Sequence, residues 1–229
     1  MKKAIIPKSA LTFLTALSKN NNRDWFNLNK ETYLKEYENM IAFTEALQNK
    51  IALHDHIELN PGKKTLFRIY ADIRFSKDKT PYKNHWSGRF KRATKKLRGG
   101  YYFHIQPGNS FVAGGFFAPN PDDLKRIRQD IDLNEKDWRK MLANKSFVKT
   151  FGKLQGDQVL SAPKGFSKDH SAIDLLRYKQ FIIKHAFTDK EVTAPDFLTN
   201  INDTFKKMRP FFDYMSEVLT TDLNGVSMV

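Results

Sequence analysis

The spacing of apolar residues divides the chain into helical ends and a strand-rich middle. Leu11, Leu14 and Leu17 recur every three residues, which predicts a short helix that begins near Ser9. Between residues 29 and 51 the apolar residues recur every three or four positions. This spacing is typical of a long amphipathic helix, whose apolar face must be covered by another layer of the fold.

The pattern changes to period two at Phe67. Every second residue from Phe67 to Phe75 is apolar, which predicts a half-buried strand with a polar face. Neighbours on that face would lie about 7 Å apart. Such a row is either an anion-binding surface or a ladder of ion pairs, and its members are Arg68, Tyr70, Asp72 and Arg74.

Further strands are expected directly after this segment. Residues 86–90 alternate, and residues 101–106 and 111–117 flank a four-residue turn, Pro-Gly-Asn-Ser, as in a hairpin. The pair Gly114 and Gly115 predicts a bulge, or a place where a ligand or another backbone comes close.

The rest of the chain is predicted to be helical. Asn120 and Pro121 form a cap and first turn, another helix follows from about Glu135, and residues 172–184 have helical spacing. A last helix is expected from Pro195, with a kink or restart at Pro210. We therefore predict a single α+β domain over residues 1–229, with a roughly four-stranded antiparallel sheet flanked by helices from the N- and C-terminal parts.

Positive charge is concentrated in one region of the chain. The whole sequence has 39 Lys and Arg against 25 Asp and Glu, a net charge of +14. Residues 63–98 alone contain 13 Lys or Arg and two Asp, a net charge of +11, which leaves +3 for all other residues. A local excess of this kind predicts a negatively charged partner.

Other features restrict the class of protein. There are no cysteines, which excludes disulfides, thiolate catalysis and Cys-ligated metals and fits a reducing compartment. Pro7 and Lys8 interrupt the N-terminal apolar residues, and no stretch approaches the length of a membrane span, so we expect a cytoplasmic protein without membrane association. His54 and His56 could share a strand face, but with no third ligand nearby we predict a polar connection and no metal.

Four sequence motifs resemble those of a known family: RDWF at 23–26, FRIYADIRFSKDKTPYK at 67–83, GYYFHIQPG at 100–108 and PKGFSKDH at 163–170. The chain is similar, from about Ser9 to Leu219, to a family of conserved hypothetical proteins found in bacteria and some fungi and classified as a domain of unknown function. The resemblance implies no reaction, cofactor or catalytic residue. Ala71 stands where the family motif commonly has Arg, and Ser171 stands where Pro is usual.

The first functional hypothesis is a basic, aromatic-edged pocket for a phosphate-rich or polyanionic ligand, such as a nucleotide or nucleic acid. Cations bind phosphate and the neighbouring rings can stack on bases. The expected anion-binding residues are Arg68, Arg74, Lys77, Lys79, Tyr82 and Lys83, with His85 beside them and His104 on the wall. A second charged loop is expected to contribute Lys164, Lys168, Asp169 and His170.

Two alternatives come from other classes. Asp72, His85 and His104 offer a carboxylate and two imidazoles, the groups needed to hydrolyse a phosphoester or an acyl substrate. No known nucleotide-binding or hydrolase motif accompanies them. The second alternative is a structural or interaction module without a ligand. The sequence specifies neither a cofactor nor an oligomeric state.

Overall fold

The computed structural model of the protein describes residues 4–222 and 225–229. The backbone forms two compact units, each assembled from segments far apart in the sequence. Unit 1 holds residues 1–90, 102–112 and 186–203, and unit 2 holds residues 91–101, 113–185 and 204–229. Every strand of the sheet and the last helix contribute residues to both units, so the single domain over residues 1–229 stays a prediction.

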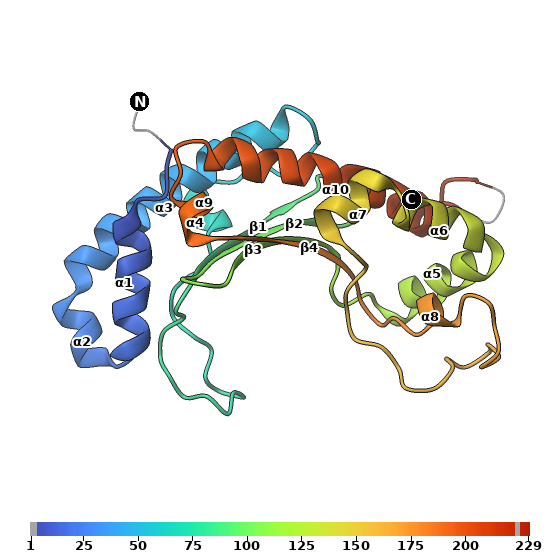
Figure 1. Cartoon of the computed structure of the whole chain (residues 1–229), viewed down its shortest axis with the longest axis horizontal. Coiled ribbons are helices and arrows are strands. Elements are labelled where there is room, and N and C mark those ends of the chain that lie inside the picture. Colours follow the sequence, from blue (N-terminus) through green and yellow to red (C-terminus); the bar gives the residue numbers. More distant parts are fainter. Residues whose placement is uncertain (1–3, 223–224) are drawn as a thin grey trace. The chain divides into compact units, whose positions relative to one another are not determined.

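The element order follows the predicted division, with helices at both ends (Figure 1). The N-terminal helices are α1 (Lys8–Lys19), α2 (Arg23–Leu28), α3 (Lys30–Ala52) and α4 (Gly62–Thr65). The strands are β1 (Trp86–Lys91), β2 (Gly100–Ile105), β3 (Ser110–Phe116) and β4 (Phe181–Phe187). The other helices are α5 (Pro121–Leu133), α6 (Glu135–Leu142), α7 (Lys145–Phe151), α8 (Ile173–Leu176), α9 (Asp189–Val192) and α10 (Phe197–Thr220).

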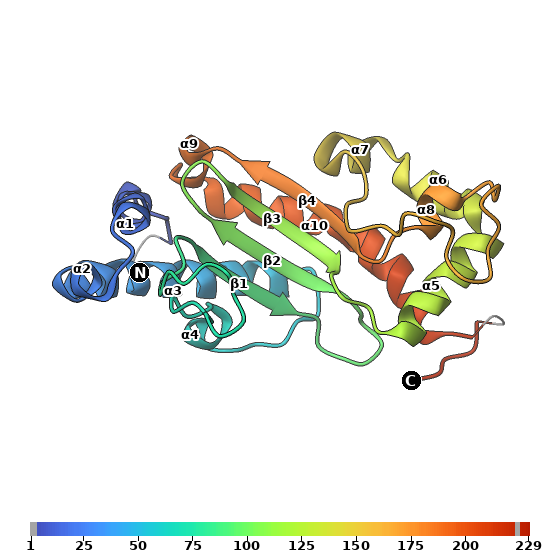
Figure 2. The same cartoon turned by 90° about the horizontal axis from the view of Figure 1, so that it is seen from below.

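The four strands form one antiparallel sheet in the order β1-β2-β3-β4, which confirms the predicted α+β class. Figure 2 shows the strands side by side. In unit 1, Phe103 of β2 packs against Phe43 of α3, with ring centroids 6.4 Å apart. In unit 2, Tyr101 of β2 packs against Phe205 and Phe212 of α10, at 4.9 and 5.0 Å. Because side chains alternate along a strand, the intervening residues lie on the other face of the sheet.

The predicted strand over residues 67–75 is wrong, because the segment forms no strand and makes only isolated antiparallel bridges, Leu66 with Gly88 and Tyr70 with Tyr82. Phe67 N–H donates to the Ser87 carbonyl at the start of β1, and Lys83 N–H donates to the Ile69 carbonyl, so residues 66–70 run antiparallel to residues 82–88. Pairing ends at Ala71, whose N–H donates to the carbonyl of Pro81. Beyond it the backbone is a loop, and Phe75 is 94% exposed. The alternation continued in the sequence without a partner strand to support it, since Pro81 cannot donate to a ladder.

The fourth strand of the sheet was not predicted. Residues 172–184 were expected to form a helix, whereas α8 ends at Leu176 and β4 begins at Phe181. Phe181, Ile183 and Phe187 are buried, and the residues between them are less so, as expected of a strand. The helical pattern was inferred from too few apolar residues to distinguish period 3.6 from period two.

Gly115 explains how β4 joins the sheet. It has φ +124°, and a Cβ on it would lie 2.1 Å from the carbonyl oxygen of Phe181. A Cβ on Gly114 would lie 2.4 Å from the ring of Phe212 on α10. The glycine pair therefore allows another backbone and a helix to approach, one of the alternatives expected for it.

The predicted turn and the predicted cap at Asn120 are present, whereas the last helix begins at Phe197, two residues after the expected start at Pro195. Asn109 N–H donates to the Gln106 carbonyl in the hairpin between β2 and β3. Asn120 caps α5 by accepting from Asp123 N–H, and Pro121 occupies its first turn. Pro210 lies inside α10, which continues through it. Among the described residues, no helix combines the length and apolar character needed to cross a bilayer.

Candidate ligand-binding site on the sheet

An aromatic cluster lies on the side of the sheet in unit 1 opposite to the core. We call it the aromatic face, and its members are Phe67, His85, Tyr102, His104 and Phe111. His104 is sandwiched between two rings, with centroids 4.1 Å from His85 and 4.7 Å from Phe111. Tyr102 lies 5.9 Å from Phe111 and 6.4 Å from Phe67. His104 is buried, Phe67 is 38% exposed, and the other three are partly exposed, so ring surface remains accessible.

A chain of hydrogen bonds fixes the orientation of His104. Its Nε2 lies 2.9 Å from Gln106 Oε1, which can only accept, so Nε2 carries the proton. The Nδ1 atom then accepts from the Tyr102 hydroxyl at 3.0 Å. Ser87 is also hydrogen-bonded to Tyr102. Both ring nitrogens of His104 are thus occupied by protein groups, and the residue acts as a rigid support for its neighbours.

His85 differs from His104 because its ring nitrogens have no protein partner. Within the described residues no group is hydrogen-bonded to them. Burial, followed by the nearby His104 and Lys83, lowers the pKa of His85 from 6.5 to about 4. The imidazole is therefore neutral at physiological pH and offers one donor and one acceptor to a ligand.

Cations border the aromatic face. Lys83 Nζ lies 5.9 Å from the centroid of the Phe67 ring and donates to the Arg68 carbonyl at 3.0 Å. Burial and the neighbouring Arg68 lower the pKa of Lys83. Arg68 and Arg89 are exposed, and within the described part of the chain Arg68, Lys83 and Arg89 form no ion pair with a carboxylate. This positive charge is available to a ligand.

The loop after Ala71 satisfies some of its own charges. Arg74 binds Asp72 through two hydrogen bonds of 2.9 and 2.7 Å, and this pairing lowers the pKa of Asp72 to about 2. Lys79 donates to the Ile73 carbonyl at 2.9 Å. Lys77 is exposed. The ion-pair alternative therefore describes Arg74 and Asp72, whereas Arg68 interacts with the Asp72 carboxylate through charge alone, without a contact ion pair.

Several predicted residues lie away from the aromatic face. Tyr82 is buried in unit 1, where its ring stacks on Phe26 at 3.9 Å. Asp72 is bound by Arg74, while His85 and His104 stack on each other. Of the three candidate catalytic residues, the structure thus brings the two histidines together and gives Asp72 a different partner.

The second charged loop belongs to unit 2, and side chains at its end are hydrogen-bonded to helices α5 and α6. His170 Nε2 lies 2.8 Å from Asp132, and its Nδ1 accepts from the N–H of Ala172 at 3.0 Å. The neighbouring Ser171 hydroxyl donates to Glu135. The remaining predicted residues of this loop, Lys164, Lys168 and Asp169, are exposed. His170 therefore has both nitrogens engaged in holding the loop.

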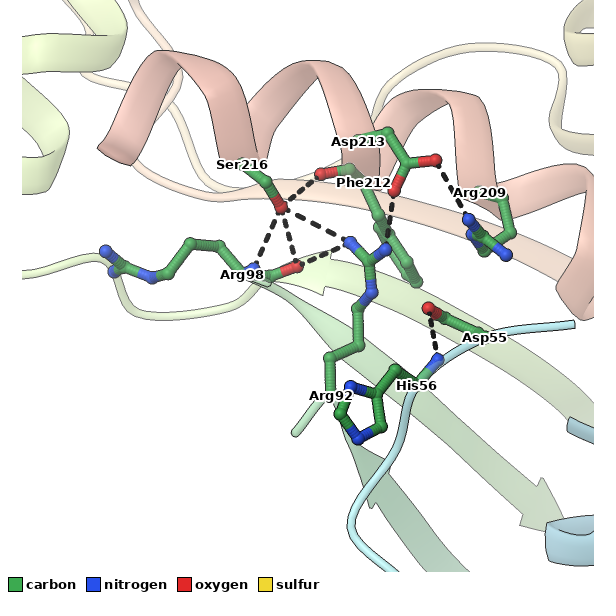
Figure 3. Close-up of polar contacts among 8 residues, drawn as sticks. All are labelled: Asp55, His56, Arg92, Arg98, Arg209, Phe212, Asp213 and Ser216. Atoms are coloured by element: carbon green, nitrogen blue, oxygen red, sulfur yellow. Dashed lines mark hydrogen bonds and ion pairs between the residues drawn. The ribbon is translucent and has the colours of Figure 1, made fainter. Parts of the chain in front are cut away.

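One cation of the basic region has a structural role (Figure 3). Arg92 belongs to the positively charged region of residues 63–98, yet its side chain is fully buried in unit 2. It pairs with Asp213 of α10 at 2.5 Å, lies 3.3 Å from Ser216 Oγ, and places its guanidinium 5.8 Å from the Phe212 ring centre. Arg98 pairs with Asp123 in the same unit. The net charge of residues 63–98 thus overstates the charge available to a partner.

His54, one of the two histidines considered as metal ligands, is hydrogen-bonded to another side chain of unit 1. His54 Nε2 lies 3.0 Å from Asn202 Oδ1. Across residues 4–222 and 225–229, no three His, Asp or Glu side chains are grouped as a metal ion would require.

Four ring and polar positions were absent from the predicted anion-binding and catalytic residues: Phe67, Tyr102, Gln106 and Phe111. A signal for two of them was present in the alternation of β2, where Tyr102, His104 and Gln106 share the face opposite to Tyr101 and Phe103. Phe67 was assigned to the buried side of a regular strand, and no local pattern indicated that its ring would be partly exposed.

Comparison with known proteins gives a family but no activity. The sequence model of a family described as conserved hypothetical protein (DUF2461) matches residues 9–214. No curated protein and no solved structure matched the chain significantly.

Proposed function

The chain belongs to the conserved hypothetical protein family DUF2461, and from the geometry of unit 1 we propose that it binds a nucleotide-containing polyanion. The expected ligand is a single-stranded nucleic acid. Its bases would stack on the aromatic face, and its phosphates would be held by Arg68, Lys83 and Arg89.

The observation that carries the proposal is that accessible rings lie beside a cation, Lys83, which forms no ion pair with a described carboxylate. Phe67 and Tyr102 are partly exposed, and Lys83 lies beside Phe67 without a carboxylate partner. Single-strand binding proteins combine these two features, and each stacked base contributes roughly 1–3 kcal/mol. A duplex fits less well because its bases are already stacked on one another.

His85 adds a polar contact to the stacking surface. Its neutral ring offers a donor and an acceptor that no protein group uses. Either could pair with the edge of a base, since both kinds of group occur there. The reducing intracellular environment predicted from the absence of cysteines would supply such ligands, and a cytoplasmic location is part of the proposal.

The test is fluorescence anisotropy with a labelled single-stranded oligonucleotide of roughly ten nucleotides, within the range covered by small single-strand binding folds. Tyr102→Leu should weaken binding about 5- to 100-fold, while Tyr102→Phe, which keeps the ring, should bind nearly as the native protein does. Joint replacement of Arg68→Gln and Lys83→Gln should also weaken binding strongly. Lys35→Gln removes one exposed charge from α3 and should leave affinity unchanged.

Two results would contradict the proposal. Equal binding of inorganic polyphosphate and the oligonucleotide would show that bases are not recognised. Equal affinity of the native protein and the Tyr102→Leu variant would show that the aromatic face is not the site.

A second candidate function is hydrolysis of a phosphoester bound on the same face. It is favoured by the unpaired nitrogens of His85, because a neutral imidazole near a bound substrate can accept a proton from water. Asp72 is not required in this version, since Arg74 engages its carboxylate. Incubation of the protein with the labelled oligonucleotide and with a nitrophenyl phosphodiester would test it: turnover abolished in His85→Phe supports hydrolysis, and intact substrate leaves binding alone.

A further inference from the structure

Unit 2 contains a hollow that is separate from the aromatic face. Its volume is about 600 Å³, within the range of small-molecule sites. Helices α6 and α7 and the middle of α10 form its walls. The lining residues are Asp137, Lys140, Met141, Asn144, Ser146, Phe147, Lys206, Lys207, Pro210, Phe211 and Tyr214.

The base of the hollow is apolar and firmly packed. Phe147 and Phe211 are 6% and 1% exposed, and their ring centroids lie 6.4 Å apart. Tyr214 stands edge-on to the buried Trp138 at 5.4 Å and donates its hydroxyl to Asp130 at 3.0 Å. Because the hydroxyl is bound elsewhere, Tyr214 contributes mainly its ring. Burial and the neighbouring Asp130 raise the pKa of Tyr214, which keeps this ring uncharged.

The rim of the hollow is basic. Lys140, Lys206 and Lys207 are exposed there, against the single carboxylate of Asp137. Within the described residues Lys140 and Lys207 have no ion-pair partner. The Ser146 hydroxyl also forms no hydrogen bond with described protein groups, whereas Asn144 caps α7. The rim therefore offers two unpaired ammonium groups and a hydroxyl above an apolar base.

We propose that this hollow binds a small amphiphilic anion, a medium-length acyl chain that ends in a carboxylate. The chain would lie on Phe147 and Phe211, where its burial is favourable. The carboxylate would face Lys140 and Lys207, and the excess of positive charge selects an anion over a cation. The volume is in the range of small-molecule sites, so the proposed ligand is a single free chain of roughly ten carbons. This proposal is independent of the function assigned to unit 1.

The probe is decanoate, measured by isothermal titration calorimetry below the concentration at which it forms micelles. The native protein should bind one decanoate per chain saturably, and decyltrimethylammonium, which has the same chain and the opposite charge, should bind at least tenfold more weakly. Joint replacement of Lys140→Gln and Lys207→Gln should weaken decanoate binding about fivefold or more. Met141→Trp, which places a large ring at the lining, should abolish it.

Lys136→Gln provides the matched control, because Lys136 is exposed on α6 but does not line the hollow. Its affinity for decanoate should equal that of the native protein. Thermal melting of each variant establishes that it is folded. The proposal is overturned if decanoate does not bind, if the cationic amphiphile binds equally well, or if neither the lysine pair nor Met141→Trp affects binding.

Discussion

Acidification should destabilise the protein through His85. The folded-state pKa is about 4, below the ordinary value of 6.5, because the ring is buried and lies beside His104 and Lys83. Between these two values the unfolded chain binds a proton that the folded chain excludes, so stability is lost as the pH falls from 6.5 towards 4. The stability contributed by the neutral His85 ring is fully present only above pH 6.5.

The magnitude follows from the two pKa values. At pH 5 the linkage relation gives about 2 kcal/mol for a shift from 6.5 to 4. The His85 ring is partly exposed, so water screens part of the interaction, and we expect about 1 kcal/mol. For a chain of this length that corresponds to a fall in melting temperature of roughly 2–4 °C.

The assay compares the native protein with His85→Phe at pH 7.5 and pH 5 by thermal melting. Phenylalanine keeps a ring against His104 but cannot be protonated. Carboxylates titrate in both proteins, so their effects cancel in the difference between the two pH responses. The native protein should lose about 1 kcal/mol more than the variant, and an NMR titration should place the pKa of His85 below 5.5. Equal losses in the two proteins, or a His85 pKa near 6.5, would refute the reasoning.

Two further perturbations test the packing of unit 2. Asp213→Asn leaves the guanidinium of Arg92 buried without its carboxylate, so the free energy of unfolding measured in urea should fall by about 2 kcal/mol. Glu217→Gln, on the same helix, should have little effect. Similar losses in the two variants would mean that the ion pair is not a specific stabiliser. Gly115→Ala should destabilise by about 3 kcal/mol or more, because φ is +124° and the new Cβ would meet the Phe181 carbonyl. Gly108→Ala, also at positive φ but with open space around it, should cost only about 1 kcal/mol by thermal melting, and an equal cost at both positions would contradict a role for close approach of β4.

Much of the fold followed from local patterns. Short-range periodicity and turn residues are visible in the local sequence. They predicted the long helix α3, the cap at Asn120 and the hairpin between β2 and β3. Strand β4 depends instead on pairing with β3, a contact between residues nearly seventy positions apart. The loop after Ala71 shows the converse, since its alternation had no partner strand.

The candidate site was only partly predictable for the same reason. Arg68, Lys83, His85 and His104 were selected because charge and ring chemistry are visible residue by residue. Tyr82 was predicted among the residues of the anion-binding pocket, because nothing in the local sequence indicates that it stacks on Phe26 in the core. The roles of Arg92 and His170 depend on carboxylates that are distant in sequence, Asp213 and Asp132.

The salt dependence of oligonucleotide binding tests the central claim most directly. Three phosphate contacts, from Arg68, Lys83 and Arg89, predict that log affinity falls against log salt concentration with a slope of about −2 on a single strand. The joint Arg68→Gln and Lys83→Gln variant should then have a slope near −0.7, because one contact remains. A slope that is the same in both proteins would contradict binding of phosphates by the cations beside the aromatic face.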